Sequence, residues 1–215
     1  MTRMQDTKEL LKFTIPQLLR WRVQKTGDKV ALREKDFGYW NNYTWNDFYD
    51  RVGKVALGLD KIGIKKGDKL ALIGDNIPEL IFMAIGAQSI GAVSAGIYQT
   101  SLPDEIAELI NYMDVTAVFC DDQEQVDKLV EVRDRIPQVR KVIYEDPRGM
   151  RDYRSDDWFI DIKDLYEIGA AAHAEDPQKY DTFIDQGKPD DVCHFCLTSG
   201  TTGLPKASIM SHFRW

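Results

Sequence analysis

The feature of the sequence that most constrains the fold is a regular alternation of short apolar runs with helix-forming stretches. The apolar runs have the length of strands, and they cover residues 69–74, 92–98, 115–120 and 139–144. The stretches between them begin with Asn, Asp, Ser or Pro, residues that favour helix starts. Strands that alternate with helices predict an α/β fold, with a mostly parallel sheet covered by helices on both faces and connected by right-handed crossovers.

Shorter segments precede this alternation. Residues 10–23 form an amphipathic stretch that Pro16 interrupts. Residues 44–47 resemble a capping box and predict a helix that continues to about Ile62. A strand pair across a turn that contains Gly38 is predicted between these two helical segments, over residues 28–34 and 39–43.

The C-terminal third continues the pattern after a polar break. Residues 145–157 carry many charges and predict a long surface loop. Residues 158–160 lead into a helix expected over 161–172. A further helix is expected from Asp176 to just before Gly187, followed by a strand at 192–197 and a paired strand at 207–210.

The composition is that of a folded globular chain. Of the 215 residues, 43% are hydrophobic and 11% aromatic, which is enough to build a core and excludes a disordered chain. The formal net charge is −7, which argues against nucleic acid as a partner because a phosphate backbone requires a basic face.

The three cysteines, a small and odd number, indicate a reducing compartment. The expected localisation is cytoplasmic, and peripheral contact with a membrane stays open. Cys193 and Cys196 form a C-x-x-C pattern, but no second ligand pair at metal-binding spacing accompanies it, so we expect core packing and no metal site. Acidic pairs at residues 121–122, 156–157 and 190–191 are interpreted as solvated caps and loop residues.

Residues 80–98 carry no charge over 19 positions, which is close to the length of a membrane span. The stretch contains several glycines and polar residues, and Gly91 is typical of a helix stop. A helix followed by a buried strand therefore explains it better than a transmembrane segment.

Residues 198–206 differ from the rest of the chain, because hydroxyls, two glycines and a lysine leave almost no apolar surface. Glycines allow close approach of the backbone, and successive N–H groups form a concavity for phosphate oxygens. Most loops of this composition bind nothing. The Walker pattern does not fit, since Gly200 and Gly203 are too close together and Ala207 follows Lys206.

The order of residues in this loop resembles the signature of the adenylate-forming, or AMP-binding, superfamily of acyl-CoA ligases, luciferases and peptide-synthetase adenylation domains. Residues 198–206 match Thr-Ser-Gly-Thr-Thr-Gly-x-Pro-Lys, and Ser211 and His212 match the Ser-His pair that follows. Ala207 stands where the family usually has glycine. We expect Ala207 to lie at the start of the next strand, where alanine is harmless.

Further landmarks resemble bacterial long-chain fatty-acid–CoA ligases in the expected order, at residues 27–35, 43–45, 67–69, 74–79 and 96–98. The resemblance implies a large N-terminal domain of α/β subdomains followed by a small mobile C-terminal domain. It also implies a two-step reaction. A fatty acid or other carboxylate attacks the α-phosphate of ATP and releases pyrophosphate, and the thiol of coenzyme A then takes the acyl group from the adenylate.

The resemblance assigns ATP phosphate binding to Thr198, Ser199, Gly200, Thr201, Thr202, Gly203 and Lys206. Donors preset around the β- and γ-phosphates, with the Mg²⁺ that ATP carries, would stabilise the charge that develops on the leaving pyrophosphate. No catalytic residue is assigned within this chain, and His212 is expected to be structural.

The family's adenine-binding segment, its Tyr-Gly-x-Thr-Glu motif, its ribose-binding Asp and its C-terminal lysine are not found in the 215 residues. We therefore expect residues 1–215 to be the N-terminal portion of an AMP-binding domain that ends just after the phosphate-binding loop, lacks the C-terminal domain and does not catalyse adenylation alone. The alternatives are a synthetase for another carboxylic acid, or a truncated fragment that serves as a non-catalytic interaction module. Homo-oligomers through an exposed apolar patch also stay open.

Overall fold

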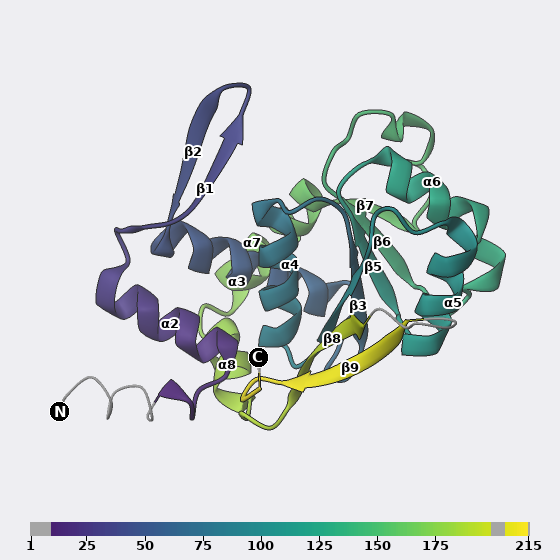
Figure 1. Cartoon of the computed structure of the whole chain (residues 1–215). Coiled ribbons are helices and arrows are strands. Elements are labelled where there is room, and N and C mark those ends of the chain that lie inside the picture. Colours follow the sequence, from purple (N-terminus) through teal and green to yellow (C-terminus); the bar gives the residue numbers. More distant parts are fainter. Residues whose placement is uncertain (1–9, 199–204, 215) are drawn as a thin grey trace.

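The computed structural model of the chain describes residues 10–198 and 205–214. In this part of the chain a seven-stranded sheet has the order β7-β6-β5-β3-β4-β8-β9, and a separate hairpin, β1–β2, projects from the body (Figure 1). Neighbouring strands from β7 to β8 are parallel, and only β9 runs antiparallel to its neighbour. The predicted α/β fold with a mostly parallel sheet is confirmed.

The strands follow the predicted apolar runs closely. The hairpin consists of β1 (Val30–Asp36) and β2 (Tyr39–Thr44). The sheet consists of β3 (Lys69–Ile73), β4 (Val93–Ile97), β5 (Ala117–Cys120), β6 (Lys141–Tyr144), β7 (Phe159–Asp161), β8 (Val192–Thr198) and β9 (Lys206–Ser211).

The helices connect these strands in the expected order. They are α2 (Ile15–Thr26), α3 (Trp45–Lys61), α4 (Pro78–Ser89), α5 (Pro103–Met113), α6 (Gln123–Glu131), α7 (Ile162–Glu175) and α8 (Lys179–Gln186). The region predicted as a long loop contains only a short 3-10 turn at Met150–Asp152. The uncharged run at 80–98 forms α4 and β4, as predicted, and among the described residues no helix has the length and apolarity needed to cross a membrane.

Two details differ from the sequence prediction. Pro16 does not interrupt the first helix but lies in its first turn, where its missing N–H costs nothing, and Thr14 and Gln17 form a reciprocal capping box before it. Residues 158–160 were expected only to lead into a helix, yet Phe159–Asp161 pairs with β6 as an edge strand. Asp161 then caps α7, since its carboxylate accepts a hydrogen bond from the Lys163 N–H at 2.8 Å.

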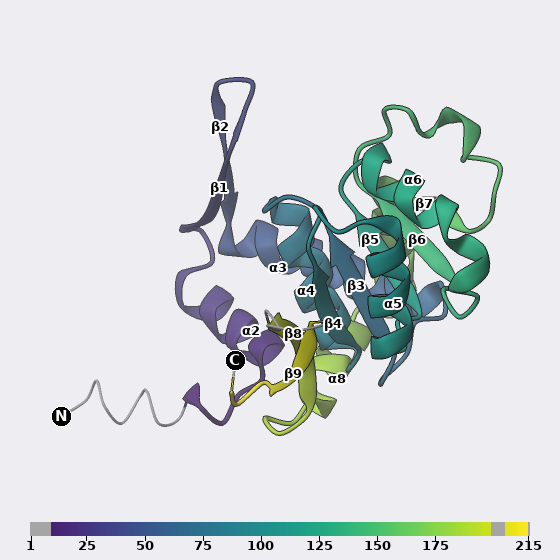
Figure 2. The same ribbon diagram turned by 45° about the vertical axis from the view of Figure 1, so that its right-hand side comes forward.

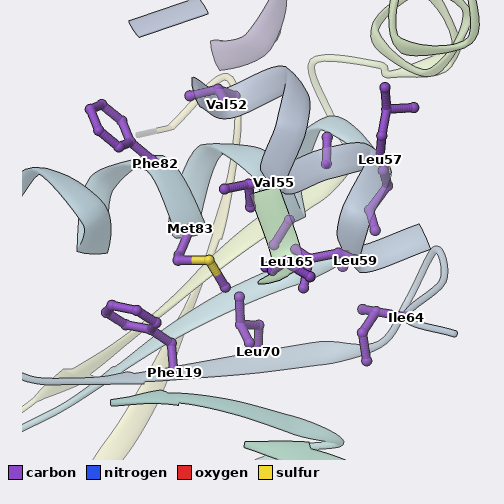
Figure 3. Close-up of a cluster of buried hydrophobic side chains, with 14 of the residues drawn as sticks. Val52, Val55, Leu57, Leu59, Ile64, Leu70, Phe82, Met83, Phe119 and Leu165 are labelled. Atoms are coloured by element: carbon purple, nitrogen blue, oxygen red, sulfur yellow. The ribbon is translucent and has the colours of Figure 1, made fainter. Parts of the chain in front are cut away.

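Helices α2, α3, α4, α7 and α8 cover one face of the sheet, and α5 and α6 cover the other (Figure 2). The first core joins apolar side chains of α3 and α4 to Leu70 on β3 and Phe119 on β5 (Figure 3). The second core joins α5 and α6 to alternate residues of the same strands, including Ala71 and Val118. Both faces of the sheet are therefore buried, as parallel strands require.

Helix α3 lies unusually close to α7, and glycines make this approach possible. A Cβ placed on Gly58 of α3 would lie 2.6 Å from the carbonyl oxygen of Leu165. A Cβ placed on Gly169 of α7 would overlap the carbonyl oxygen of Lys54. Because the obstructing atoms are backbone, no side-chain rotation relieves either contact.

We therefore expect Gly169→Ala to lower the free energy of unfolding by about 1–3 kcal/mol, although alanine is the better helix former by about 1 kcal/mol. Urea unfolding monitored by circular dichroism measures the change. The matched control is Ala171→Ser at an exposed position of the same helix, expected within about 0.5 kcal/mol of wild type. An unchanged urea midpoint for Gly169→Ala would contradict the close packing.

Candidate functional site

The carboxyl ends of β3, β4, β5, β6 and β8 meet at one edge of the sheet because these strands are parallel. Strand β3 lies between β4 and β5 in the sheet. The chain passes from β3 to β4 on one side, and then crosses over β3 to form β5 on the other side. Open α/β sheets bind ligands outside the carboxyl ends of their strands near such a reversal. This edge is therefore the place to look for a site.

The hydroxyl- and glycine-rich segment connects β8 to β9 at this edge. Thr198 and Lys206 are directly opposite each other in the antiparallel ladder, and the Thr198 hydroxyl donates a hydrogen bond to the Lys206 carbonyl at 3.0 Å. The Lys206 side chain is exposed. Of the other predicted site residues, Ser199, Gly200, Thr201, Thr202 and Gly203 lie outside the described residues. Ala207 lies within β9 and not at a positive φ, so alanine is harmless there, as predicted.

An apolar cavity of about 430 Å³ opens beside the end of β8. Helix α4 and strands β3, β4 and β8 form its walls, and its lining includes Leu80, Ile81, Ala84, Ile85, Ile97 and Leu197. Gly96 lies on its floor, and a Cβ placed there would meet nothing within 4 Å. Glycine at this strand position therefore leaves space beside the cavity that a larger side chain would occupy.

A chain of buried polar groups borders this cavity. The Gln88 amide donates to the Ser94 hydroxyl at 3.1 Å, and Ser94 Oγ lies 2.8 Å from Nδ1 of His194. Burial lowers the pKa of His194 to about 4, so the ring is neutral at pH 7. The side-chain amide oxygen of Gln88, Oε1, is buried and has no hydrogen-bond partner among the described residues. This polar chain was not predicted from the sequence, because its members lie on three separate elements.

A second cleft, of about 480 Å³, lies beside Pro205, the residue directly before β9. It is lined by Thr100, Ser101 and Pro205, the first described residue after the gap, together with two glutamates from α5, Glu105 and Glu108. The glutamates make this cleft unfavourable for a phosphate group.

Two interpretations of polar residues need correction. Asp121 is not a solvated cap residue, because it is only 9% exposed and its carboxylate accepts a hydrogen bond from the Asp75 N–H at 2.6 Å. Burial raises its pKa. Core packing was correct for Cys193, which is buried, but wrong for Cys196, which is exposed, since residues three apart on a strand face opposite sides. In the described residues no cluster of His, Cys, Asp and Glu is suited to hold a metal ion.

Glu145, directly after β6, has its pKa raised to about 7, mainly by burial and then by the nearby carboxylates of Glu79 and Asp146. This carboxyl group therefore titrates close to neutral pH at the same edge of the sheet. The nearby Lys163 acts in the opposite direction on this pKa.

His212 fixes the far end of β9. Its Nδ1 accepts a hydrogen bond from the Ile15 N–H at 3.2 Å, and the side chain is 8% exposed. Burial lowers the pKa of His212 to about 4, although Asp191 acts in the opposite direction. The neutral ring thus joins the start of α2 to the end of β9, in keeping with a structural role.

Comparison with known proteins decides the family. The model of the AMP-binding enzyme family matches residues 19–215, nearly the whole chain. The chain belongs to the AMP-binding enzyme family. The residues that resemble the family signature connect β8 to β9, at the carboxyl edge of a parallel sheet.

Curated relatives of this AMP-binding chain are long-chain-fatty-acid–CoA ligases. ACSBG1 of Homo sapiens is 27% identical over 202 residues, which cover 94% of this chain and 27% of that protein. ACSBG2 of Xenopus laevis is 28% identical over 208 residues, which cover 96% of this chain and 27% of that protein. The chain thus spans about a quarter of the length of these relatives.

Solved structures share the fold of this AMP-binding chain. An anthranilate CoA ligase, AuaEII, in complex with anthranoyl-AMP superposes with a TM-score of 0.77 and 20% identity, covering 94% of this chain and 35% of that one. The N-terminal domain of FACL13 from Mycobacterium tuberculosis gives a TM-score of 0.72 and 23% identity, covering 93% of this chain and 44% of that one.

The His212 contact predicts a specific pH dependence. The folded pKa of about 4 lies below the ordinary value of 6.5, so the unfolded chain binds the proton first. The contribution of the neutral His212 ring to the free energy of unfolding is full above pH 6.5 and is lost as the pH falls toward 4. We expect His212→Asn, whose amide oxygen accepts the same hydrogen bond without titrating, to reduce this loss by roughly 1–3 kcal/mol.

Urea unfolding of wild type and variant at pH 7 and pH 4.5 measures the difference. Other titrating groups contribute equally to both proteins, so their effect on the free energy of unfolding cancels in the comparison. Glu145 is one such group, and its raised pKa stabilises the fold as the pH falls, opposite to the effect of His212. His173→Asn, at an exposed position of α7, is the matched control and should keep the wild-type pH dependence. Equal pH dependence in all three proteins would exclude a role for His212.

Proposed function

We propose that this chain takes part in the ATP-dependent activation of a long-chain fatty acid to the acyl-adenylate and then to acyl-CoA, and that residues 198–206 form its ATP phosphate-binding loop. Membership of the AMP-binding family supports activation of a carboxylic acid in general. The relatives named as long-chain-fatty-acid–CoA ligases favour a fatty acid over other acids. The observation that carries the proposal is the position of Thr198 and Lys206 at the carboxyl edge, beside an apolar cavity.

Electrostatics explains why a loop of this kind suits the first step. A carboxylate and ATP repel each other, and negative charge gathers on the pyrophosphate as it leaves. Thr198, Ser199, Gly200, Thr201, Thr202 and Gly203 would donate hydrogen bonds to the β- and γ-phosphates, and Lys206 would add a positive charge. ATP brings Mg²⁺ with it, and coenzyme A is the co-substrate of the second step.

The apolar cavity offers a place for the hydrocarbon part of the acid. It begins at Cys196 and Leu197, immediately before the loop, and continues along α4 and over Gly96. A carboxylate at the loop and an acyl chain in this cavity would place the reacting oxygen next to the phosphates. Its volume and apolar lining are those of a small-molecule site.

We further propose that the 215 residues do not complete the adenylation reaction without further residues of the kind that the longer relatives contain. The chain matches only 27% of the length of ACSBG1 of Homo sapiens. The adenine and ribose motifs of the family are absent from the sequence. The chain is proposed to supply the phosphate-binding part of the site.

We expect Lys206→Met to weaken the binding of Mg·ATP at least tenfold, because it removes the positive charge next to the phosphates, a loss of about 1.4 kcal/mol or more. Isothermal titration calorimetry on the chain measures the change. Lys25→Met, which removes an exposed lysine in the last turn of α2, is the control and should bind as wild type does.

Equal affinity of wild type and Lys206→Met would contradict the assignment of the loop. The same preparations serve for an ATP–pyrophosphate exchange assay with palmitate, in which we expect no exchange. Robust fatty-acid-dependent exchange would show that the 215 residues suffice for adenylation. The calorimetric comparison of wild type with Lys206→Met would still test the assignment of the loop.

We expect Gly96→Val to lower the affinity for a fluorescent long-chain fatty acid at least fivefold, because the new side chain enters the apolar cavity. Folding should be preserved, since the added Cβ meets nothing within 4 Å and valine favours strands. Fluorescence titration measures binding, and thermal unfolding checks the fold. Ser208→Val, on the exposed β9, controls for a valine added to a strand. Unchanged binding by a folded Gly96→Val would place the acyl chain elsewhere.

A further inference from the structure

The β1–β2 hairpin is set apart from the rest of the molecule. It rises from the junction of α2 and α3, and its outer end stands clear of the rest of the molecule in two views (Figures 1 and 2), whereas Ala31, Leu32 and Tyr43 near its base pack against the first core. Neither strand joins the seven-stranded sheet. An isolated two-stranded hairpin is only marginally stable in water, so its protrusion calls for an explanation.

The tip of this hairpin carries an aromatic cluster, Phe37, Tyr39 and Trp40, which we call the tip aromatics. Their exposed fractions are 91%, 78% and 61%. Large aromatic side chains usually bury most of their surface, and no other three in the described residues are this exposed within four positions of the chain. Contiguous exposed apolar groups of this kind mark interaction surfaces.

The turn at the tip places a phenylalanine in a backbone conformation that this residue type rarely adopts. Phe37 has φ +44° and Gly38 has φ +88°, so both lie in the left-handed region that two-residue hairpin turns require. Asn, Asp or Gly normally occupies the first of these positions, and phenylalanine is disfavoured there. The Phe37 side chain makes no compensating contact with the body, since it is almost fully exposed. Folding therefore gains nothing from an aromatic residue at this position.

The base of the hairpin is well anchored, so the tip is held in place. Tyr43 packs edge-on against Phe82 of α4 with ring centroids 5.7 Å apart, and its hydroxyl donates to the Glu34 carboxylate at 3.2 Å. The ladder is in register from Leu32 opposite Tyr43 to Asp36 opposite Tyr39. A ribbon fixed at one end presents its tip to a partner without a large loss of conformational entropy.

The two faces of the ribbon differ in charge. Residues opposite each other in the ladder share a face, so Trp40 lies with Lys35, and Arg33 lies two residues further along the same face. The other face carries Tyr39 with the acidic Asp36 and Glu34. Aromatic and basic groups therefore combine on one face next to the tip.

We propose that the tip aromatics insert into the interfacial region of a lipid bilayer, with Arg33 and Lys35 facing anionic headgroups. Tryptophan and tyrosine prefer the headgroup level of membranes, where their rings are half apolar and half polar. Basic residues near the surface add attraction to anionic lipids. A tip of three residues is too small for a specific protein interface, which requires about 800 Å² on each partner, but it suits a shallow insertion. The proposal does not depend on the proposed catalytic function.

Flotation with vesicles of phosphatidylcholine and phosphatidylglycerol tests the proposal on the 215-residue chain. We expect wild type to float with the vesicles, and the double variant Phe37→Asn, Trp40→Thr to lose at least tenfold in partition coefficient. Asparagine suits the left-handed turn and threonine suits a strand, so this variant should unfold at the same or a higher temperature. Loss of binding without loss of stability separates a docking role from a structural one.

Phe213→Ser removes an exposed aromatic residue far along the chain and is the matched control, expected to bind vesicles as wild type does. Arg33→Gln with Lys35→Gln should reduce binding to anionic vesicles more than to neutral ones. Failure of wild type to float, or equal flotation of the tip variant, overturns the proposal. Self-association that requires the tip aromatics, seen by analytical ultracentrifugation in the absence of vesicle binding, also overturns it and assigns the tip to a protein partner.

Discussion

The arrangement of the molecule depends on the alternation of side chains along β3. Leu70 and Leu72 point into the core under α3 and α4, whereas Ala71 and Ile73 point into the core under α5 and α6. A slip of one residue would exchange these two sets, so that the small Ala71 would replace a leucine under α3 and α4 and a leucine would be forced into the space of Ala71 on the other face. The same register places Gly74 at the carboxyl edge, where the side chain of Asp121 occupies the space that a Cβ would need. The packing of the central strand thus fixes the geometry of the edge at which the candidate site lies.

Much of the fold follows from local signals in the sequence. Strands β3, β4 and β5 are nearly continuous apolar runs, and the caps at Thr44 and Asp122 follow directly from residue type. The errors occurred where a signal has two meanings. Proline either ends a helix or begins one, and only the Thr14–Gln17 capping box, which sequence analysis overlooked, distinguishes the two at Pro16. The edge strand β7 has three residues, and it is defined by its pairing with β6 more than by its own composition.

The candidate site was predictable only in part. The motif at residues 198–206 predicts a phosphate-binding loop from the order of its residues, and this stays a prediction because residues 199–204 lie outside the described part of the chain. The polar chain of Gln88, Ser94 and His194 could not be predicted, since it joins α4, β4 and β8 across a hundred residues of sequence. Asp121 was misread for the same reason: its burial comes from the backbone of residue 75, which no local pattern reveals. Tertiary contacts, and not propensities, decide the environment of such polar groups.

The two residues that flank the loop are held by one strand ladder, and a second contact holds the far end of β9. Thr198 and Lys206 occupy opposite positions in the β8–β9 ladder, and β8 is parallel to the buried strand β4. The far end of β9 is tied through the neutral ring of His212 to the backbone of Ile15, which begins α2. A loop whose ends are fixed on a packed sheet loses less conformational entropy when a ligand orders it than a loop on mobile supports. The cost of ordering the loop would therefore offset less of the hydrogen-bond energy of an anion bound here. The same tie makes the support of the loop sensitive to acid, because a protonated His212 no longer accepts the hydrogen bond from Ile15.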